Sequence, residues 1–364
     1  MKVLLIGSKE YPFNSSKGFD KYAGGGIEKH VEKLAKYLEK EGHETIIITR
    51  QFPGQNQFEQ NGRIKVYRTR FLSNKYLRNF SYNLKAYKLA KRIIREEKPD
   101  LIHSHAVVAG YFGAKLSKKT GIPMVFTPHG SVIGWRFPVR SALKRMETKA
   151  LKTAEKTLYI SPNAMKETGY LARKKALLTN AIDLDDFTSG KRTWKPIRFL
   201  FMGRFLGFKG IIHSLEAFEQ LLHDFKDVEF FIAGDGELRQ GVDAFARRIP
   251  QIHNLGWVSD AEERLLHTDV FVLPTTERGQ PIALLEAMAS EKIILTSLNF
   301  IEDNRTGIRV EQDVGDLREK MLLICKNFRD LQKLGMNARK EIEEKYSWDK
   351  VVKQFLREYK SVID

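Results

Sequence analysis

Strand-like and helix-like stretches alternate along almost the whole chain, and the alternation starts twice. Short apolar runs typical of buried strands, such as 2–7 and 44–50, are separated by stretches with apolar residues at helical spacing, such as 27–42. A polar, turn-rich stretch at 185–196 interrupts this pattern, which then restarts at 197–204. Strands that alternate with helices predict a parallel sheet covered by helices on both faces, so the chain predicts two doubly wound α/β domains.

The position of the restart divides the chain into three parts. We expect a Rossmann-like N-terminal domain over residues 1–188 and a Rossmann-like C-terminal domain over 189–340. A terminal helix at 341–364 is a candidate to pack back on the N-terminal domain. The 364 residues are enough for two separate hydrophobic cores.

Cysteine content and hydropathy limit the cellular compartments in which this chain is expected. The one cysteine, Cys325, excludes a disulfide framework and a cysteine-based metal site, and it fits a reducing environment. The apolar run at 2–7 is too short for a signal peptide, and no stretch reaches the apolar length that crosses a bilayer. We therefore expect a cytoplasmic protein, with the inner membrane face as a candidate location.

Positive charge is concentrated in the first half of the chain. The net charge is +17, and residues 1–190 hold 35 Lys and Arg against 17 Asp and Glu. The remaining residues hold 27 against 28 and are nearly neutral. This imbalance predicts that the first half faces an anionic partner, for which phosphate-bearing substrates, nucleic acid and acidic lipid headgroups are candidates.

Three glycines and a histidine lie where the first predicted sheet would bind a ligand, beyond the carboxyl ends of its strands. Gly24, Gly25 and Gly26 directly precede a helix and leave backbone N–H groups open to a ligand. Neither a spaced dinucleotide fingerprint nor a P-loop is present, which argues against a nicotinamide dehydrogenase. His129 ends a predicted strand, and the pattern favours a structural and a functional role about equally.

The second predicted sheet has two further candidate loops. Arg204 and Lys209 lie on one tight loop between its first strand and first helix, where two cations suit a diphosphate. In TTERGQPIALLEAMAS (275–290), a turn leads into an apolar helix that carries one carboxylate, Glu286. The helix start offers N–H groups to the oxygens of a ligand, and Glu286 is able to accept two ribose hydroxyl groups.

Taken in order, these stretches resemble the family-4 retaining glycosyltransferases of the GT-B fold, in which two Rossmann-like domains face each other across a cleft. The resemblance covers nearly the whole chain and rests on GGGIEKHVEKLAKYLEKEGHE, PDLIHSHA, GIPMVFTPHG, TNAIDLDDF, FMGRFLGFKG, IAGDGELR, LGWVSDAEE, DVFVLPT and ERGQPIALLEAMAS. It implies a hexosyltransferase that uses a nucleotide sugar, with a UDP- or GDP-sugar as the favoured donor, and no further cofactor.

The resemblance also implies roles for individual residues. Those implied in catalysis are His129, which would meet the transferred sugar, and Arg204 and Lys209, which would bind the diphosphate. Those implied in substrate binding are Gly25, Gly26, Glu277, Arg278, Gly279, Gln280, Pro281, Ile282 and Glu286. Among the latter, Glu286 would hold the ribose hydroxyl groups.

Two departures from the family pattern concern the donor site. The family has two glutamates with seven residues between them, and counting back from Glu286 the first falls on Arg278, with Glu277 one position away. After KIILTS (292–297) the family usually has a Gly-Gly loop, which TSLNFIEDNRTG lacks. These departures favour, as an alternative, a GT-B scaffold or partner protein with impaired donor binding.

The resemblance implies that the anomeric configuration is retained and that the leaving phosphate helps to deprotonate the acceptor. Because Arg204, Lys209 and a helix N-terminus would stabilise the charge of that phosphate, no metal ion is predicted. The basic stretches 74–95 and 135–152 contain aromatic residues and suit an acidic membrane surface with a glycan or lipid-linked acceptor, although a solvated outer helix face fits each of them equally well. Since no nucleic-acid motif accompanies the charge, no nucleic-acid partner is predicted.

Overall fold

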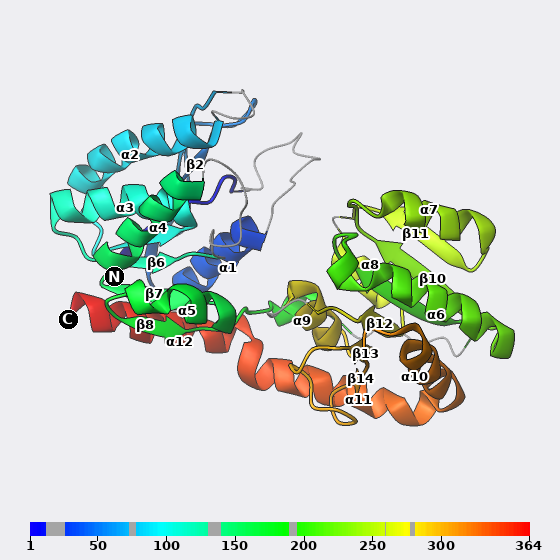
Figure 1. Ribbon diagram of the computed structural model, residues 1–364. Helices are drawn as coiled ribbons and strands as arrows, with labels where there is room; N and C mark the ends of the chain where they lie inside the picture. The colour runs from blue at the N-terminus through cyan, green and yellow to red at the C-terminus, as the bar shows by residue number, and fades with distance from the viewer. Residues whose placement is uncertain (12–25, 73–77, 130–139, 189–194, 259, 277–280) are drawn as a thin grey trace. The chain divides into compact units, whose positions relative to one another are not determined.

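The computed structural model describes residues 1–11, 26–72, 78–129, 140–188, 195–258, 260–276 and 281–364. These residues form two compact units (Figure 1). Unit 1 comprises Met1–Thr179 together with Trp348–Asp364, and unit 2 comprises Asn180–Ser347. Both units are α/β, with parallel sheets, as the alternation in the sequence predicts.

The sheet of unit 1 has eight strands in the order β3-β4-β2-β1-β5-β6-β7-β8. All neighbouring strands are parallel except β3 and β4, which form an antiparallel hairpin. The strands are β1 (Lys2–Ile6), β2 (Glu44–Arg50), β3 (Phe58–Asn61), β4 (Ile64–Thr69), β5 (Leu101–His105), β6 (Met124–Thr127), β7 (Lys156–Tyr159) and β8 (Lys175–Leu177). The hairpin was not expected from the sequence, because the edge strand β3 has the polar, mostly exposed sequence FEQN.

Helices cover both faces of this sheet (Figure 1). They are α1 (Gly26–Lys40), α2 (Arg78–Glu97), α3 (Val107–Thr120), α4 (Arg140–Thr153), α5 (Pro162–Thr168) and the C-terminal α12 (Trp348–Ile363). Side chains of α2, α3 and α4 share a hydrophobic core with alternate residues of the central strands, such as Leu4, Ile6 and Ile102. Helix α12 lies against α1, where the rings of Trp348 and Tyr37 stack 5.8 Å apart.

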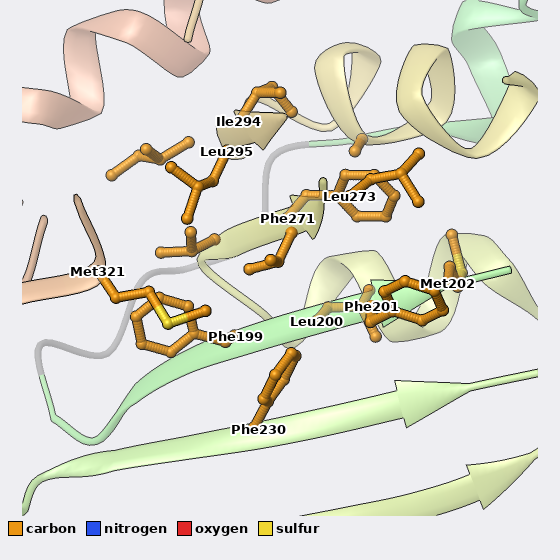
Figure 2. Close-up of a cluster of buried hydrophobic side chains, with 14 of the residues drawn as sticks. Phe199, Leu200, Phe201, Met202, Phe230, Phe271, Leu273, Ile294, Leu295 and Met321 are labelled. Carbon is orange, nitrogen blue, oxygen red and sulfur yellow. The ribbon is translucent and has the colours of Figure 1, made fainter. Parts of the chain in front are cut away.

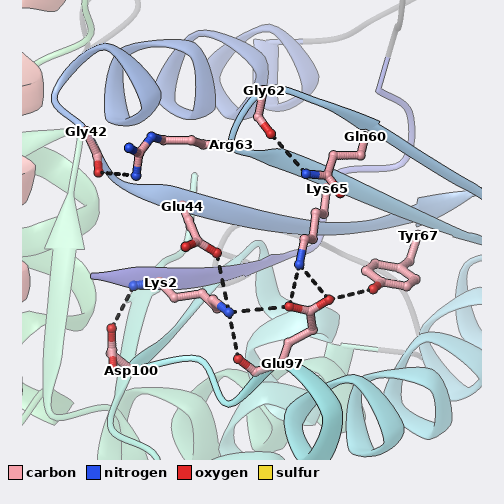
Figure 3. A network of polar contacts seen from close by, with 10 residues as sticks. All are labelled: Lys2, Gly42, Glu44, Gln60, Gly62, Arg63, Lys65, Tyr67, Glu97 and Asp100. Atoms are coloured by element: carbon pink, nitrogen blue, oxygen red, sulfur yellow. Dashed lines mark hydrogen bonds and ion pairs between the residues drawn. The ribbon is translucent and has the colours of Figure 1, made fainter.

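A polar network ties the amino ends of the strands in unit 1 together (Figure 3). Glu97, near the end of α2, accepts hydrogen bonds from Lys65 Nζ at 2.7 Å and from Tyr67 Oη at 2.9 Å. Lys2 Nζ also donates to the carbonyl oxygen of Glu97 at 2.9 Å, and the Lys2 backbone N–H donates to Asp100 Oδ2 at 2.7 Å. Because this network occupies the edge opposite the carboxyl ends of the strands, it stabilises the sheet and leaves the ligand-binding edge to other residues.

The sheet of unit 2 has six parallel strands in the order β11-β10-β9-β12-β13-β14. The strands are β9 (Ile197–Met202), β10 (Val228–Ala233), β11 (Ile252–Gly256), β12 (Val270–Leu273), β13 (Ile293–Thr296) and β14 (Ile308–Arg309). The helices are α6 (Ile211–Asp224), α7 (Arg239–Arg248), α8 (Ala261–Leu266), α9 (Ile282–Ala289), α10 (Val314–Lys326) and α11 (Phe328–Glu341). The strand order reverses direction between β9 and β12, which is the switch point where such sheets bind ligands.

The core of unit 2 contains several phenylalanine rings among its aliphatic side chains (Figure 2). Phe199, Phe230 and Phe271 come from three neighbouring strands and are fully buried. The rings of Phe199 and Phe230 lie 6.2 Å apart in an edge-to-face arrangement, which is a favourable geometry for aromatic pairs. This packing holds the central strands β9, β10 and β12 in place, and with them the loops that follow.

The boundaries of the units differ from those expected from the sequence. Unit 2 begins at Asn180 rather than at residue 189, because Ile182 and Phe187 are buried in its core. The guanidinium of Arg339 donates to the carbonyl oxygen of Phe187 at 2.8 Å and anchors this segment. The C-terminal helix that belongs to unit 1 begins at Trp348 rather than at residue 341.

None of the helices in the described part of the chain combines the length and the apolar character needed to cross a membrane.

Candidate functional site

The loop after β9 carries both predicted diphosphate ligands. Arg204 is exposed, whereas Lys209 is only 9% exposed and ends a short 3₁₀ turn, Gly207–Lys209. The ammonium of Lys209 lies 5.8 Å from the centre of the Phe208 ring. A cation held at the start of α6, next to the positive end of that helix dipole, suits an anionic ligand.

Backbone and side-chain hydrogen bonds join this loop to the chain that follows β12. The carbonyl oxygen of Phe208 accepts from the backbone N–H of Thr276 at 2.9 Å and from Thr275 Oγ1 at 3.1 Å. Gln312 Nε2, which lies beyond β14, donates to the carbonyl oxygen of Gly207 at 3.2 Å. Three segments that are distant in sequence are therefore fixed together at the carboxyl edge of the sheet, at its switch point.

Gly210 allows these segments to approach closely. It has φ 74°, a left-handed conformation that favours glycine, and it precedes α6. A Cβ atom at this position would lie 2.5 Å from the carbonyl oxygen of Pro274 and 2.9 Å from Gln312 Nε2. Only glycine fits there without movement of the chain after β12.

Helix α9 contains the predicted ribose ligand. It begins after Pro281, whose carbonyl oxygen accepts from the N–H groups of Leu284 and Leu285, and within the described residues no side chain caps its first turn. Glu286 lies in its second turn and is 8% exposed.

The described residues include only part of the predicted donor loop. Pro281 and Ile282 are at the start of α9, half-buried. In unit 1, Gly26 is the first residue of α1 and is exposed. The predictions for Gly25, Glu277, Arg278, Gly279 and Gln280 lie outside the described residues.

The chain after β13, where the family usually has a Gly-Gly loop, forms a compact turn. The N–H of Glu302 donates to Thr306 Oγ1 at 2.9 Å, and the N–H of Asn304 donates to the carbonyl oxygen of Gly307 at 2.8 Å. Asn337 Nδ2, from α11, donates to the carbonyl oxygen of Arg305 at 3.0 Å. The short connection is thus internally bonded and leads directly into β14.

His129, at the carboxyl end of β6, belongs to a cluster of imidazoles in unit 1. It has φ 57°, and its Nε2 lies 2.9 Å from Nδ1 of His105 at the end of β5. The ring of His30, from α1, lies 5.1 Å from that of His129 and 5.7 Å from that of His105. Sequence reasoning singled out His129 alone, although the spacing HSH places His103 and His105 on the same face of β5.

Burial controls the protonation of this cluster. It lowers the pKa of His30 to about 4, because the charged imidazolium is poorly solvated there. Burial, with a further contribution from neighbouring imidazoles, also holds the pKa of His105 and His129 well below the usual range of histidine. All three imidazoles are therefore neutral near pH 7, and each has one ring nitrogen with a lone pair, one of which accepts the hydrogen bond between His105 and His129.

A groove lined mainly by basic side chains lies over α3 and α4 in unit 1. The groove has a volume of about 610 Å³ and is lined by Lys118, Ser141, Lys144, Arg145, Thr148, Lys149, Lys152 and Thr153. Five of these eight side chains are cationic and none is acidic, so the groove attracts anions. The basic stretch that was predicted at 135–152 from the sequence therefore supplies most of this surface.

Comparison with known proteins identifies the family. The model for Glycosyltransferase Family 4 matches residues 24–186, and the model for Glycosyl transferases group 1 matches residues 196–327. The chain belongs to the group 1 glycosyltransferases. The two matches cover both units, and the resemblance inferred from the sequence motifs is confirmed.

Individual relatives agree with this assignment. A glycosyltransferase of Methanocaldococcus jannaschii, itself uncharacterised, is 28% identical over 361 residues, which cover 93% of this chain and 95% of the relative. The alpha-monoglucosyldiacylglycerol synthase of Acholeplasma laidlawii is 24% identical over 356 residues, covering 86% and 88%. The crystal structure of Anabaena Alr3699/HepE in complex with UDP-glucose superposes with a TM-score of 0.74 at 15% identity, covering 99% of this chain and 100% of HepE. This last likeness concerns the fold, which is the GT-B fold of the group 1 glycosyltransferases.

Proposed function

We propose that this glycosyltransferase moves a hexose from a nucleoside diphosphate sugar to a glycan or lipid-linked acceptor, with retention of the anomeric configuration and without a metal ion at the diphosphate. The observation that carries the proposal is the position of Lys209, nearly buried at the start of α6 on a loop bonded through Phe208 to the chain before α9. The UDP-glucose bound by HepE supports the same donor class.

The charge that develops on the leaving group explains why these residues suit a diphosphate. When the bond to the sugar breaks, negative charge accumulates on the leaving nucleoside diphosphate, and donors fixed in advance stabilise that charge. Lys209 and Arg204 supply positive charge, and the N-terminus of α9 supplies backbone N–H groups. With this arrangement the reaction does not need a divalent ion, so transfer is expected to continue when EDTA is present.

Glu286 gives the sharpest test of the donor site. We would measure binding of UDP, GDP and ADP and their common sugar conjugates by isothermal titration calorimetry to the wild type and to Glu286→Gln. Glutamine keeps one acceptor oxygen, so the loss of one charge-assisted hydrogen bond is expected to cost about 1.5–3 kcal/mol, which weakens binding of the preferred nucleotide about 10- to 150-fold. Glu319→Gln, an exposed glutamate on α10, is the matched control and is expected to bind like the wild type. Equal affinities for Glu286→Gln and the control would refute the assignment of the ribose ligand.

The proposal for the acceptor rests on the basic groove of unit 1. The surface of an acidic membrane carries phosphate in its lipid headgroups, and five cations on α3 and α4 complement it. The relative named alpha-monoglucosyldiacylglycerol synthase supports an acceptor of the lipid class. We therefore propose that the enzyme works at the inner face of a membrane, to which it binds reversibly.

Flotation with vesicles tests this location. The wild type is expected to float with vesicles that contain anionic phospholipid and not with neutral vesicles, and added salt should reduce the floating fraction. Reversal of two charges with Lys144→Glu and Arg145→Glu should abolish flotation, whereas Lys226→Glu and Lys326→Glu in unit 2 should leave it intact. If the wild type does not float with anionic vesicles, the proposed membrane location is wrong, and a soluble glycan becomes the proposed acceptor.

A scaffold protein with impaired donor binding is the second candidate function. It is favoured by the short, internally bonded turn after β13, which takes the place of the usual Gly-Gly loop. The two candidates differ in the calorimetric experiment, because the scaffold binds none of the nucleotides. Measurable binding of any nucleoside diphosphate that depends on Glu286 therefore favours a glycosyltransferase over a scaffold protein.

A further inference from the structure

Three imidazoles in unit 1 converge on one point, and those of His30 and His105 are buried. His30 comes from α1, His105 from the end of β5 and His129 from the end of β6. One ring nitrogen from each lies within 4.8 Å of the nitrogens of the other two. Helix α12 closes the cluster on one side, with the ring of Trp348 5.3 Å from that of His30.

The spacing of the rings matches the coordination geometry of zinc. With Zn–N bonds of about 2.0–2.1 Å in tetrahedral geometry, ligand nitrogens lie about 3.3 Å apart and ring centres about 5 Å apart. The three pairs of ring centres are separated by 5.1, 5.1 and 5.7 Å. The nitrogen pair His105 Nδ1 to His129 Nε2, at 2.9 Å, has to open by about 0.4 Å. The ligand nitrogens lie within 4.8 Å of one another, so a wider pair has to close by up to about 1.5 Å.

Two members of the cluster have a buried nitrogen without a partner. Nε2 of His30 and Nε2 of His105 are shielded from water and have no hydrogen-bond partner among the described residues. A buried polar atom in this state costs about 1–3 kcal/mol. An ion held by Nδ1 of His105 would recover this cost only at His30, and Nε2 of His105 would still need an ordered water molecule.

His103 shows what a purely structural histidine looks like in the same place. It lies two residues from His105 and is fully buried. Its Nδ1 is 2.6 Å from Tyr359 Oη and its Nε2 is 2.8 Å from Thr127 Oγ1, so both ring nitrogens have partners. The protein core therefore supplies a partner for both ring nitrogens of His103. For His30 and His105, one ring nitrogen each has no partner among the described residues.

We propose that His30, His105 and His129 bind a transition metal ion of the zinc class, with the fourth coordination position open to water. His129 is partly exposed, which gives an ion access to the cluster. On binding, the hydrogen bond between His105 and His129 breaks, and the N–H of its donor ring moves to the other nitrogen of that ring. Each imidazole stays neutral, so no net proton is released.

The proposed metal site is distinct from the diphosphate chemistry, which lies in unit 2. An ion would engage Nε2 of His129, the residue implied to meet the transferred sugar, and would withdraw it from that role. The ion is therefore expected to inhibit transfer, a consequence that rests on the proposed function. The binding itself does not, since the cluster is defined by the fold of unit 1 alone.

The experiment is a titration of chelator-treated full-length protein with Co²⁺, followed by displacement with Zn²⁺. We expect visible absorption typical of tetrahedral Co²⁺ to saturate at one equivalent and to disappear when Zn²⁺ is added. His30→Gln and His105→Gln should each weaken binding at least about 100-fold, since changes that do not touch the ion already cost about 10–100-fold. His267→Gln, an exposed histidine of unit 2, should bind like the wild type.

Each other outcome overturns the proposal. Failure of the wild type to bind one equivalent would mean that the cluster is a hydrogen-bonded group of core histidines. Binding that survives both His30→Gln and His105→Gln would place the ion elsewhere. X-ray absorption of the Zn²⁺-loaded wild type counts the imidazole ligands without any variant, so the proposal remains testable if the variants do not fold, and fewer than three imidazoles would contradict it.

Discussion

Replacement of Gly210 by alanine tests how the loops of unit 2 are held together. The substitution forces an L-residue into φ 74°, which costs about 1–2 kcal/mol. The new Cβ atom would also lie 2.5 Å from the carbonyl oxygen of Pro274. Backbone cannot move aside as a flexible side chain does, so this contact is expected to add about 1–3 kcal/mol. The expected loss of stability is about 3 kcal/mol.

Gly256→Ala is the matched control. Gly256 also belongs to unit 2 and has φ 66°, but a Cβ atom there would meet nothing within 4 Å. Gly256→Ala therefore carries the cost of the left-handed conformation but makes no close contact. Alanine also restricts the unfolded chain, which is worth about 0.4–1 kcal/mol and is common to both variants. The difference between the two variants isolates the contact with Pro274 and is expected to be about 1–3 kcal/mol.

Cys325 provides a probe that reports on unit 2 alone. It is the single cysteine of the chain and is buried on α10, so a thiol reagent labels it only when unit 2 opens. Labelling in a series of urea concentrations gives the free energy of opening for each variant. Equal free energies for Gly210→Ala and Gly256→Ala, within about 0.5 kcal/mol, would refute the argument. Nucleotide binding should be lost in the first variant and retained in the second, because only Gly210 adjoins Lys209.

Three further predictions concern charge and burial. Lys209→Met is expected to weaken nucleotide binding about 10- to 150-fold in calorimetry, while the exposed Lys226→Met leaves it unchanged; equal binding would exclude a role of Lys209 at the diphosphate. Burial would raise the pKa of Glu97, but hydrogen bonds from Lys65 and other donors lower it below its ordinary value. Its contribution to stability is therefore present above about pH 4.5 and is lost as the pH falls through the lower pKa of the folded state. Glu97→Gln should accordingly cost about 1–2 kcal/mol at pH 7 in urea titrations and much less at pH 3, and a difference that does not depend on pH would contradict this reasoning. Burial also raises the pKa of Cys325 to about 12, so its alkylation in the native protein should stay slow up to about pH 9 and become fast only in denaturant.

The sequence predicted both sheets because the parallel strands of this fold have a strong local signal. Buried strands such as KVLLI (β1) and VFVL (β12) are apolar runs, and a stretch of helix-forming residues separates each from the next strand. The hairpin of β3 and β4 was not predicted, since FEQN carries no such signal and forms a strand only by pairing with β4. Strand propensity at an edge depends more on the neighbouring strand than on the residues themselves.

The candidate site was predicted in part for the same reason. The loop with Arg204 and Lys209 and the acid at Glu286 are recognisable because each is a short motif next to a predicted strand or helix. What joins the two motifs was not predictable: the bonds from Thr275 and Thr276 to the carbonyl oxygen of Phe208 span more than sixty residues. Such contacts depend on strand order, and strand order is not encoded in any local pattern.

By itself, the sequence determined the fold class, the two units and the family, because periodicity and short motifs are local properties of the chain. Only the tertiary structure decided that α12 belongs to unit 1, since that depends on contacts such as Trp348 with Tyr37, which are distant in sequence. The tertiary structure alone also brought His30 and His105 to His129. Each of these histidines looks ordinary in its own segment, and their common chemistry arises from burial and proximity, which the fold creates.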